Sequence, residues 1–245
     1  MTQFLKLLLI RHAESIGNTQ RRMEGQQSTA LSPLGQQQAQ SLAKGLIPPL
    51  ISLRTQPPNP LPQNPLRRSS SLPSHLYISP LLRAIQTANE LQAGLDQVQH
   101  TALVQRSANL QEMHPGIFQN LTWAEATAQH PALCKQLMTT LEWQPVPQSE
   151  SPIEARNRAQ QWINKLLTSH SPGDTIWAVS HAGIMLHMIA AIMGCDRTWK
   201  ITIHHTAIFE FWLASTHWNH LSQDRFNPEY WSIRRFNDTA HLKHL

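Results

Sequence analysis

Short runs of apolar residues recur along the chain, and each is bounded by polar or turn-forming residues. They occupy residues 4–10 (FLKLLLI), 76–79 (LYIS), 175–180 (TIWAVS) and 207–213 (AIFEFWL). Runs of this length are typical of strands that are buried on both faces, as in the centre of an α/β sheet. We therefore predict four buried strands at these positions.

Helical periodicity marks the segments between these runs. Ser32 and Pro33 form a helix start, with serine as the N-cap and proline at the first helical position. The apolar residues of that helix follow at i, i+3, i+4 and i+7: Ala39, Leu42, Ala43 and Leu46. Similar stripes predict helices that begin near Pro80, near Ser151 and after His181. Strands that alternate with helices indicate an α/β fold with a largely parallel sheet.

Residues 48–74 interrupt this pattern with a dense series of prolines and serines. Proline lacks a backbone N–H and has a fixed φ, so such a stretch forms neither a helix nor a central strand. We predict an extended surface insertion within a single domain that spans residues 1–245.

Composition narrows the classes of partner. Charged residues make up 14% of the chain, and the formal net charge of +5 is scattered without a block of like charges, which argues against a nucleic-acid partner. Cys134 and Cys195 lie outside any CxxC motif, as expected of free thiols in a reducing compartment. The apolar run Leu7–Ile10 is too short for a signal peptide, and residues 183–194 are too short to span a bilayer. We expect a cytoplasmic protein without a membrane partner.

Four motifs place reactive side chains where α/β proteins bind ligands. Arg11 and His12 end the first predicted strand, and His181 stands where residues 175–180 pass into a helix. Arg83 lies in the first turn of a predicted helix, near the positive end of its dipole, and Glu112 precedes a Pro-Gly turn. Taken singly, the His12 motif is better explained by a core or capping histidine, and the Arg83 motif by a solvated helix arginine. Together they indicate an anion-binding site.

The motifs also occur in a recognisable order. They read RHAES at residues 11–15 with Asn18 beyond it, SPLLRAIQTA at 79–88, LQEMHPGIFQNLTWAE at 110–125 and VSHAGI at 179–184. These segments resemble RHGES, SxLxRAxQTA, LxExxxGxxxGxTxxE and SHGG of the histidine phosphatase superfamily, which includes the cofactor-dependent phosphoglycerate mutases. Further similar segments lie at MEGQ (23–26), ALSPLGQQQA (30–39), SESPIEARNR (149–158) and NDTAHL (237–242). The resemblance covers almost the whole chain apart from residues 48–74.

The resemblance implies a fold and a mechanism. The fold is a three-layer αβα sandwich of the phosphoglycerate mutase type, and the activity is that of a phosphatase, a phosphoric monoester hydrolase that acts on a small phosphorylated metabolite through a phosphohistidine. His12 would attack phosphorus through one ring nitrogen, with the other nitrogen held by a backbone carbonyl, and Glu112 would protonate the leaving oxygen. The phosphate oxygens would be bound by Arg11, Asn18, Arg83 and a protonated His181. No metal ion or cofactor is implied, and the histidines show no HExxH-like ligand spacing.

Several positions depart from the family pattern. Ala13 and Ala182 replace glycines, Asn120 replaces a glycine in a loop that we expect to follow a different path, and His205 stands where asparagine or serine is frequent. Two further activities remain open: a phosphoglycerate mutase of the same chemistry and a catalytically inactive phosphate-binding module. The mutases usually carry a more basic segment than residues 113–180, which favours the phosphatase. The sequence does not predict the substrate or the oligomeric state.

Overall fold

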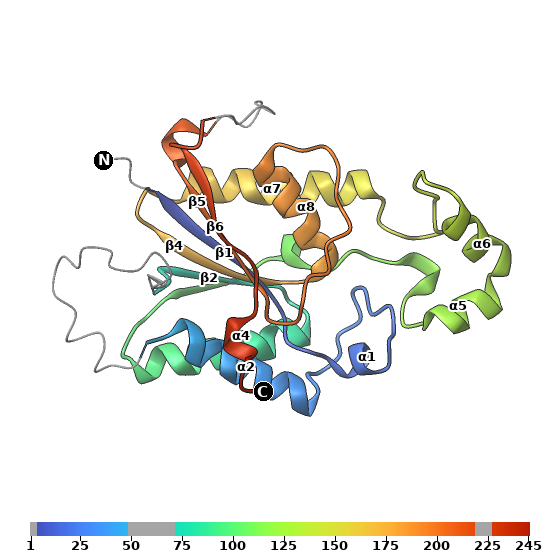
Figure 1. Cartoon of the computed structure of the whole chain (residues 1–245), viewed down its shortest axis with the longest axis horizontal. Helices are drawn as coiled ribbons and strands as arrows, with labels where there is room; N and C mark the ends of the chain where they lie inside the picture. Colours follow the sequence, from blue (N-terminus) through green and yellow to red (C-terminus); the bar gives the residue numbers. More distant parts are fainter. Residues whose placement is uncertain (1–3, 49–71, 219–226) are drawn as a thin grey trace.

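A six-stranded sheet forms the centre of the molecule (Figure 1). The computed structural model describes residues 4–48, 72–218 and 227–245, and within them the strand order is β3-β2-β4-β1-β5-β6. Four neighbouring strands are parallel: β1 (Leu5–Arg11), β2 (His75–Ile78), β3 (Leu103–Arg106) and β4 (Thr175–Ser180). Two more strands, β5 (Ile208–Leu213) and β6 (Trp231–Asp238), continue the sheet in antiparallel fashion. This confirms the prediction of a mostly parallel sheet.

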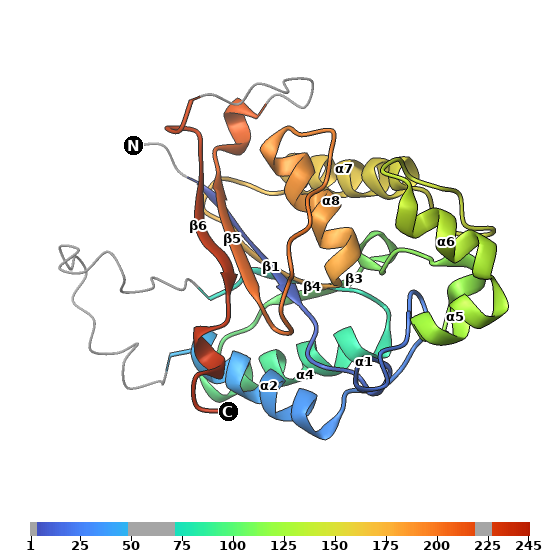
Figure 2. The same cartoon turned by 45° about the vertical axis from the view of Figure 1, so that its right-hand side comes forward.

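Helices cover both faces of the sheet (Figures 1 and 2). Two pack on one face, α2 (Pro33–Leu46) and α4 (Leu82–Gln97), and two on the other, α7 (Pro152–Ser169) and α8 (Ala182–Met193). Successive side chains of β1 alternate between the two cores, because Leu7 and Leu9 join the α7–α8 cluster whereas Leu8 and Ile10 join the α2–α4 cluster. The three-layer αβα sandwich is therefore confirmed.

The helix starts follow the predicted signals. The Ser32 hydroxyl accepts the Gly35 N–H at 2.9 Å at the start of α2. Ser151 and Glu154 form a reciprocal capping box at the start of α7. The helix predicted near Pro80 begins at Leu82, two residues later.

A small helical unit stands beside the sandwich (Figure 2). It consists of α5 (Trp123–Gln129) and α6 (Pro131–Thr139), which pack around Phe118, Ala126 and Cys134. This unit, the short helix α1 (Ile16–Thr19), β3 and β6 were not predicted. Most of the proposed insertion, residues 49–71, lies outside the described residues. Across the described ranges, no helix combines the length and the apolar character that a bilayer crossing needs.

Candidate active site

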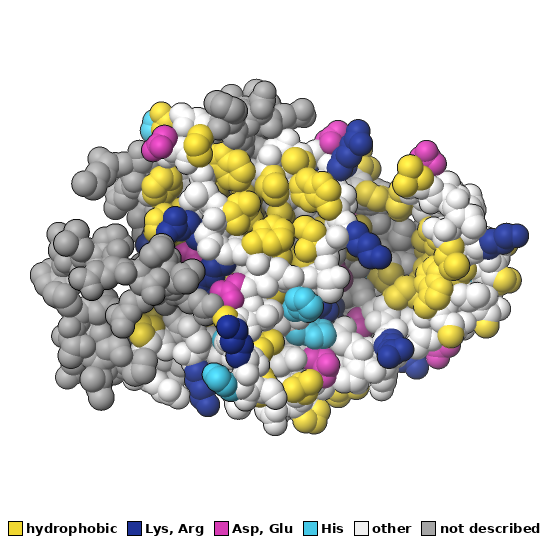
Figure 3. Space-filling model, viewed as in Figure 1, with side chains coloured by type: hydrophobic (Ala, Val, Ile, Leu, Met, Phe, Trp, Pro, Cys, Tyr) yellow, Lys and Arg dark blue, Asp and Glu magenta, His cyan; other side chains and the backbone are white. Residues whose placement is uncertain are grey.

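The carboxyl ends of three parallel strands meet at one edge of the sheet and carry the predicted side chains. Arg11 ends β1, and His12 follows it directly, while His181 follows β4 and is the N-cap of α8. A pocket of about 250 Å³ opens here, and five of the predicted residues line it: Arg11, His12, Asn18, Arg83 and Glu112. His181 is fully buried behind it, with its ring centroid 4.8 Å from that of His12. Figure 3 shows histidine side chains near the centre of this face, beside a hollow that separates the body from α5 and α6 on the right.

His12 is held in one tautomer. Its Nδ1 lies 2.7 Å from the Ala13 carbonyl oxygen, which can only accept, so Nδ1 carries the ring proton. This confirms the expected backbone carbonyl partner and leaves a lone pair on Nε2. Burial first, and then the positive charges of Arg83 and Arg11, hold the pKa of His12 well below its usual range. His12 is therefore a neutral imidazole whose Nε2 is available as a nucleophile.

Arg83 is a buried cation directly beside the His12 ring. Its Nε donates to His12 Nε2 at 3.2 Å, and its two Nη atoms donate to the carbonyl oxygens of Gln27 and Gly25 at 2.6 and 2.7 Å. The loop at residues 24–27 therefore fixes the guanidinium at the first turn of α4. Burial lowers the pKa of Arg83, whereas the carboxylates of Glu24 and Glu112 raise it.

The charge of His181 depends on what surrounds its ring. Its Nε2 bonds the Ser79 hydroxyl at 2.7 Å, and its Nδ1 is buried without a hydrogen-bond partner among the described residues. Burial first, and then the charges of Arg83 and Arg11, hold the pKa of His181 well below its usual range. Burial and the two arginines therefore disfavour the imidazolium in the chain without phosphate, and the protonated His181 expected in contact with phosphate stays a prediction. A phosphate dianion would act on this pKa in the opposite direction.

The C-terminal NDTAHL segment supports Arg11 indirectly. Arg11 donates from Nη1 to the Ile203 carbonyl oxygen at 2.5 Å. The Asn237 side chain binds the same loop on both sides of Ile203. It accepts from the His204 N–H at 3.1 Å and donates to the Thr202 carbonyl oxygen at 2.8 Å. This motif therefore holds in place the loop on which Arg11 is anchored.

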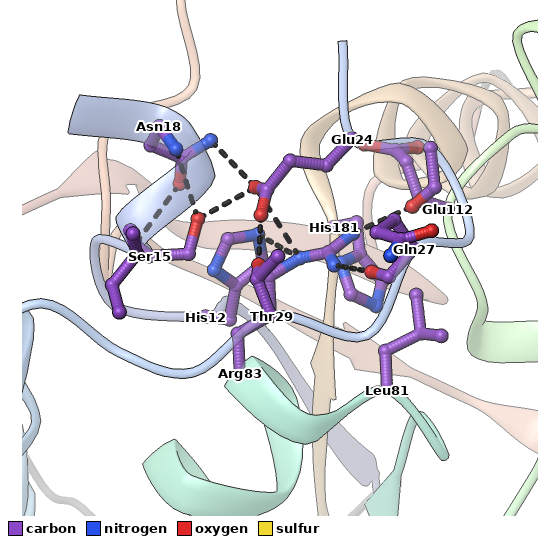
Figure 4. A network of polar contacts seen from close by, with 12 residues as sticks. His12, Ser15, Asn18, Glu24, Gln27, Thr29, Leu81, Arg83, Glu112 and His181 are labelled. Carbon is purple, nitrogen blue, oxygen red and sulfur yellow. Dashed lines mark hydrogen bonds and ion pairs between the residues drawn. The ribbon is translucent and has the colours of Figure 1, made fainter. Parts of the chain in front are cut away.

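Glu24 is a buried residue of the pocket lining that the sequence did not single out (Figure 4). Its side chain is 5% exposed, and its carboxylate accepts from Ser15 Oγ at 2.6 Å, from Asn18 Nδ2 at 3.0 Å and from the Thr29 hydroxyl. A Cβ on Gly17 would collide with this carboxylate. The only signal for Glu24 was its position in MEGQ, where the family's QGQ segment has glutamine.

Asn18 is oriented from both sides. Its Oδ1 lies 3.1 Å from His205 Nε2, and its Nδ2 donates to Glu24. Burial, followed by the charge of Arg11, lowers the pKa of His205 to about 3, so this ring is neutral. His205, which had no assigned role, thus orients the Asn18 amide together with the Ser15 N–H and Glu24.

The charges in the pocket are balanced rather than purely cationic. Glu24 Oε2 lies 3.9 Å from Arg83 Nε, and Glu112 is a second carboxylate in the lining. With the histidines neutral, the lining holds three arginines, Arg11, Arg22 and Arg83, against two carboxylates when both of these are ionised, and Arg22 is also paired with Glu125. The sequence predicted three cations around the phosphate: Arg11, Arg83 and a protonated His181. A phosphate dianion that enters this pocket meets less excess positive charge than these three would supply.

Glu112 is attached to the first turn of α8. Its Oε1 accepts from the Met113 and Ile184 N–H groups at 2.9 and 3.0 Å, and its Oε2 accepts from the Gly183 N–H at 3.0 Å. A Cβ on Gly183 would stand 2.5 Å from Glu112 Oε1, so glycine permits this close approach.

Asn120, which replaces a family glycine, adopts φ of +65°, the left-handed region that glycine favours and asparagine tolerates. The different loop path that we expected from this replacement is therefore not required.

Comparisons with known proteins agree with this geometry. The model of the histidine phosphatase superfamily (branch 1) matches residues 7–49 and 66–239. The phosphoglycerate mutase-like protein 4 of Arabidopsis thaliana is 23% identical over 98% of this chain and 88% of its own length. The glucosyl-3-phosphoglycerate phosphatase of Mycobacterium tuberculosis is 26% identical over 77% of this chain and 75% of its own length.

A solved structure shows the same fold. The α-ribazole phosphatase of Shigella flexneri superposes with a TM-score of 0.70 at 20% identity, over 96% of this chain and 97% of that one. The family model spans most of the chain and includes every motif that lines the pocket. The chain therefore belongs to branch 1 of the histidine phosphatase superfamily.

Proposed function

We propose that this chain is a metal-independent phosphatase that hydrolyses a small phosphate monoester through a phosphohistidine on His12. The observation that carries the proposal is the state of His12: a neutral ring with its Nδ1 proton bound to a backbone carbonyl and its Nε2 lone pair facing a buried arginine. A nucleophile needs that lone pair, and a phosphoryl group needs the cation. The inactive phosphate-binding module is disfavoured because every catalytic position is filled.

The first step transfers the phosphoryl group to His12. Nε2 forms a bond to phosphorus in line with the leaving oxygen, and the bond between phosphorus and that oxygen breaks. The two Nη atoms of Arg83 stay on the carbonyl oxygens of Gln27 and Gly25, while its Nε–H passes from Nε2 to a phosphate oxygen as the new bond forms. Arg11, His181 and the free donor of Asn18 bind the other phosphate oxygens. Glu112 gives a proton to the leaving oxygen.

The second step releases phosphate. Glu112, now a carboxylate, takes a proton from a water molecule, and the water oxygen bonds to phosphorus while the bond between phosphorus and Nε2 breaks. The products are inorganic phosphate and neutral His12 with its original tautomer. Three backbone N–H groups hold Glu112 in place for both proton transfers.

The rim of the pocket suits an uncharged leaving group. Met23, Met113 and Pro115 lie in the lining, and the one rim arginine, Arg22, is already paired with Glu125 at 3.0 Å. Exposed apolar side chains also occur along the α5–α6 unit and just beyond it: Trp123, Met138, Leu141 and Trp143. The proposed substrate is thus a monoester whose alcohol portion has apolar surface.

Hydrolysis is favoured over mutase activity by the same part of the chain. Residues 113–180 contain four lysines and arginines, and Arg158 among them is paired with Glu150 at 2.8 Å. A mutase must retain a negatively charged phosphoglycerate during transfer, for which this rim offers little free positive charge. Two of the similar proteins are named as phosphatases, of glucosyl-3-phosphoglycerate and of α-ribazole, whereas the Arabidopsis relative is named mutase-like.

The proposed location of the enzyme is the cytoplasm. Its two cysteines are free thiols, as is usual in a reducing compartment.

Two assays test this proposal. Hydrolysis of p-nitrophenyl phosphate should proceed in EDTA and be inhibited by vanadate, whereas an inactive binding module would show no turnover. With 3-phosphoglycerate and 2,3-bisphosphoglycerate, a phosphatase releases inorganic phosphate and a mutase forms 2-phosphoglycerate. Accumulation of 2-phosphoglycerate faster than phosphate would overturn the assignment.

A further inference from the structure

A second group of potential ligands lies at the opposite end of the sheet. His75 is the first residue of β2, His170 is the C-cap of α7, and Asp174 directly precedes β4. These segments meet on the left in Figure 1, away from the strand ends that carry His12 and His181. The catalytic mechanism makes no use of them.

The three side chains converge. One ligand atom from each lies within 4.8 Å of the others, and His170 Nδ1 is 3.6 Å from Asp174 Oδ2. The rings of His75 and His170 are in edge contact, with their centroids 4.3 Å apart and their planes at 71°. Tetrahedral zinc with bonds of about 2.0–2.1 Å places its ligand atoms roughly 3.4 Å apart, so a small closing movement suffices.

Hydrogen bonds leave a lone pair free on His75. The Ser74 hydroxyl lies 3.1 Å from the Thr175 carbonyl oxygen and 3.2 Å from Asp174 Oδ1, both of which can only accept. Its single proton is therefore committed, and the His75 Nδ1, 3.0 Å away, donates to it. The lone pair of His75 is consequently on Nε2.

Tyr77 completes the arrangement around His170. Its hydroxyl lies 2.9 Å from His170 Nε2 and can accept the proton of that nitrogen. Without a cation, the His170 Nδ1–H faces the Asp174 carboxylate and the Tyr77 hydroxyl donates to Nε2. With a cation between Nδ1 and the carboxylate, the proton moves to Nε2 and the Tyr77 hydroxyl accepts it. A histidine ligand whose other nitrogen is fixed by a hydrogen bond is typical of metal sites.

We propose that His75, His170 and Asp174 form a binding site for a borderline divalent cation such as Zn²⁺. Two imidazoles and one carboxylate match the preferences of zinc, with water as the fourth ligand. The cation would tie the end of α7 and the start of β4 to β2. Its role is structural, because the site lies at the far end of the sheet from the nucleophile.

Titration of the EDTA-treated and dialysed full chain with ZnCl₂ tests the proposal by calorimetry and by the shift in Tm. One Zn²⁺ should bind per chain and raise Tm. His75→Gln and Asp174→Asn should each weaken binding by about tenfold or more and abolish the Tm shift. His100→Gln is the matched control, since His100 bonds the Pro73 carbonyl oxygen at 2.8 Å and lies outside the cluster.

Zinc bound in the catalytic pocket is the competing outcome, and a third variant separates it. His12→Ala should bind zinc like the wild type, and removal of zinc should leave turnover of p-nitrophenyl phosphate unchanged. The proposal is overturned if the wild type shows no saturable binding, if both cluster variants bind normally, or if His12→Ala abolishes binding.

Discussion

A buried carboxylate inside an anion-binding pocket is the unusual feature at the scale of single residues. Glu24 accepts three side-chain hydrogen bonds, from Ser15, Asn18 and Thr29, and lies beside Arg83. It therefore orients Asn18 and offsets part of the arginine charge. The compensated charge limits how tightly the pocket binds phosphate, which is also the product that must leave.

Glu24→Gln should consequently strengthen the binding of inorganic phosphate and vanadate. A unit charge a few ångströms away contributes about 1 kcal/mol even at a water-like dielectric, so the inhibition constant should fall by on the order of tenfold. Steady-state inhibition of p-nitrophenyl phosphate hydrolysis measures it. Glu14→Gln is the control, because the Glu14 carboxylate accepts from Ser32 Oγ at 2.7 Å and does not line the pocket. Unchanged or weaker phosphate binding in Glu24→Gln would show that Glu24 serves only to hold its three donors.

The first turn of α8 is the element that positions the proposed acid. Glu112 is bound by the Gly183 and Ile184 N–H groups, and the absence of a side chain at Gly183 leaves room for its carboxylate. The proposed proton transfer therefore depends on this glycine, although it carries no reactive group.

Gly183→Ala should displace Glu112 and reproduce the loss caused by Glu112→Gln. An alkoxide leaves poorly without a proton, so the rate of His12 phosphorylation by an alkyl phosphate should fall by about 10²–10⁴-fold. A nitrophenolate leaves without help, so the burst with p-nitrophenyl phosphate should change far less. Ala182→Gly, one residue earlier, is the control. Equal burst losses on both substrates would mean that Glu112 positions phosphate and is not the acid.

The strands that could be predicted are those whose residues are nearly all buried, because burial on both faces gives a continuous apolar run in the sequence. β1 and β4 are buried on both faces, and their continuous apolar runs revealed them. All four residues of β3 are exposed at the sheet edge, and a register shift opposite Glu210 breaks the pattern of β6. Neither strand has a clear periodicity, so tertiary pairing alone defines them.

In the site, too, the features that depend on tertiary contacts could not be predicted from the sequence. Motifs revealed His12, Arg83 and Glu112, whose roles depend on residue type at a strand or helix end. The burial of Glu24 and the neutrality of His181 depend on side chains brought together from distant segments, so neither could be predicted from local sequence.

At the scale of the whole molecule, the pocket concentrates neutral histidines. The pKa values of His12, His181 and His205 are all lowered, chiefly by burial. Once the pH falls below the ordinary histidine value of about 6.5, the unfolded chain binds protons that the folded chain does not, so stability decreases. The folding of the domain is thereby coupled to the same desolvation that keeps His12 nucleophilic.

Urea unfolding at pH 7 and pH 5 should show this loss directly. The free energy of unfolding should be lower at pH 5, and His205→Asn, which keeps an amide donor for Asn18, should lose less stability over the same interval. His217→Asn, at an exposed histidine outside the pocket, should behave like the wild type. An identical loss in His205→Asn and wild type would contradict the assignment of a half-buried, neutral histidine at this position.

Direct detection of the phosphoenzyme tests the central claim most sharply. A millisecond reaction with p-nitrophenyl phosphate, stopped in alkali and analysed by mass spectrometry, should place one phosphoryl group on the peptide that contains His12. The modification should disappear after an acid quench, because a phosphoramidate is acid-labile, and should be absent in His12→Ala, whose turnover should fall by several orders of magnitude. Near-normal turnover in His12→Ala, or a phosphoryl group on another residue that survives acid, would contradict the account.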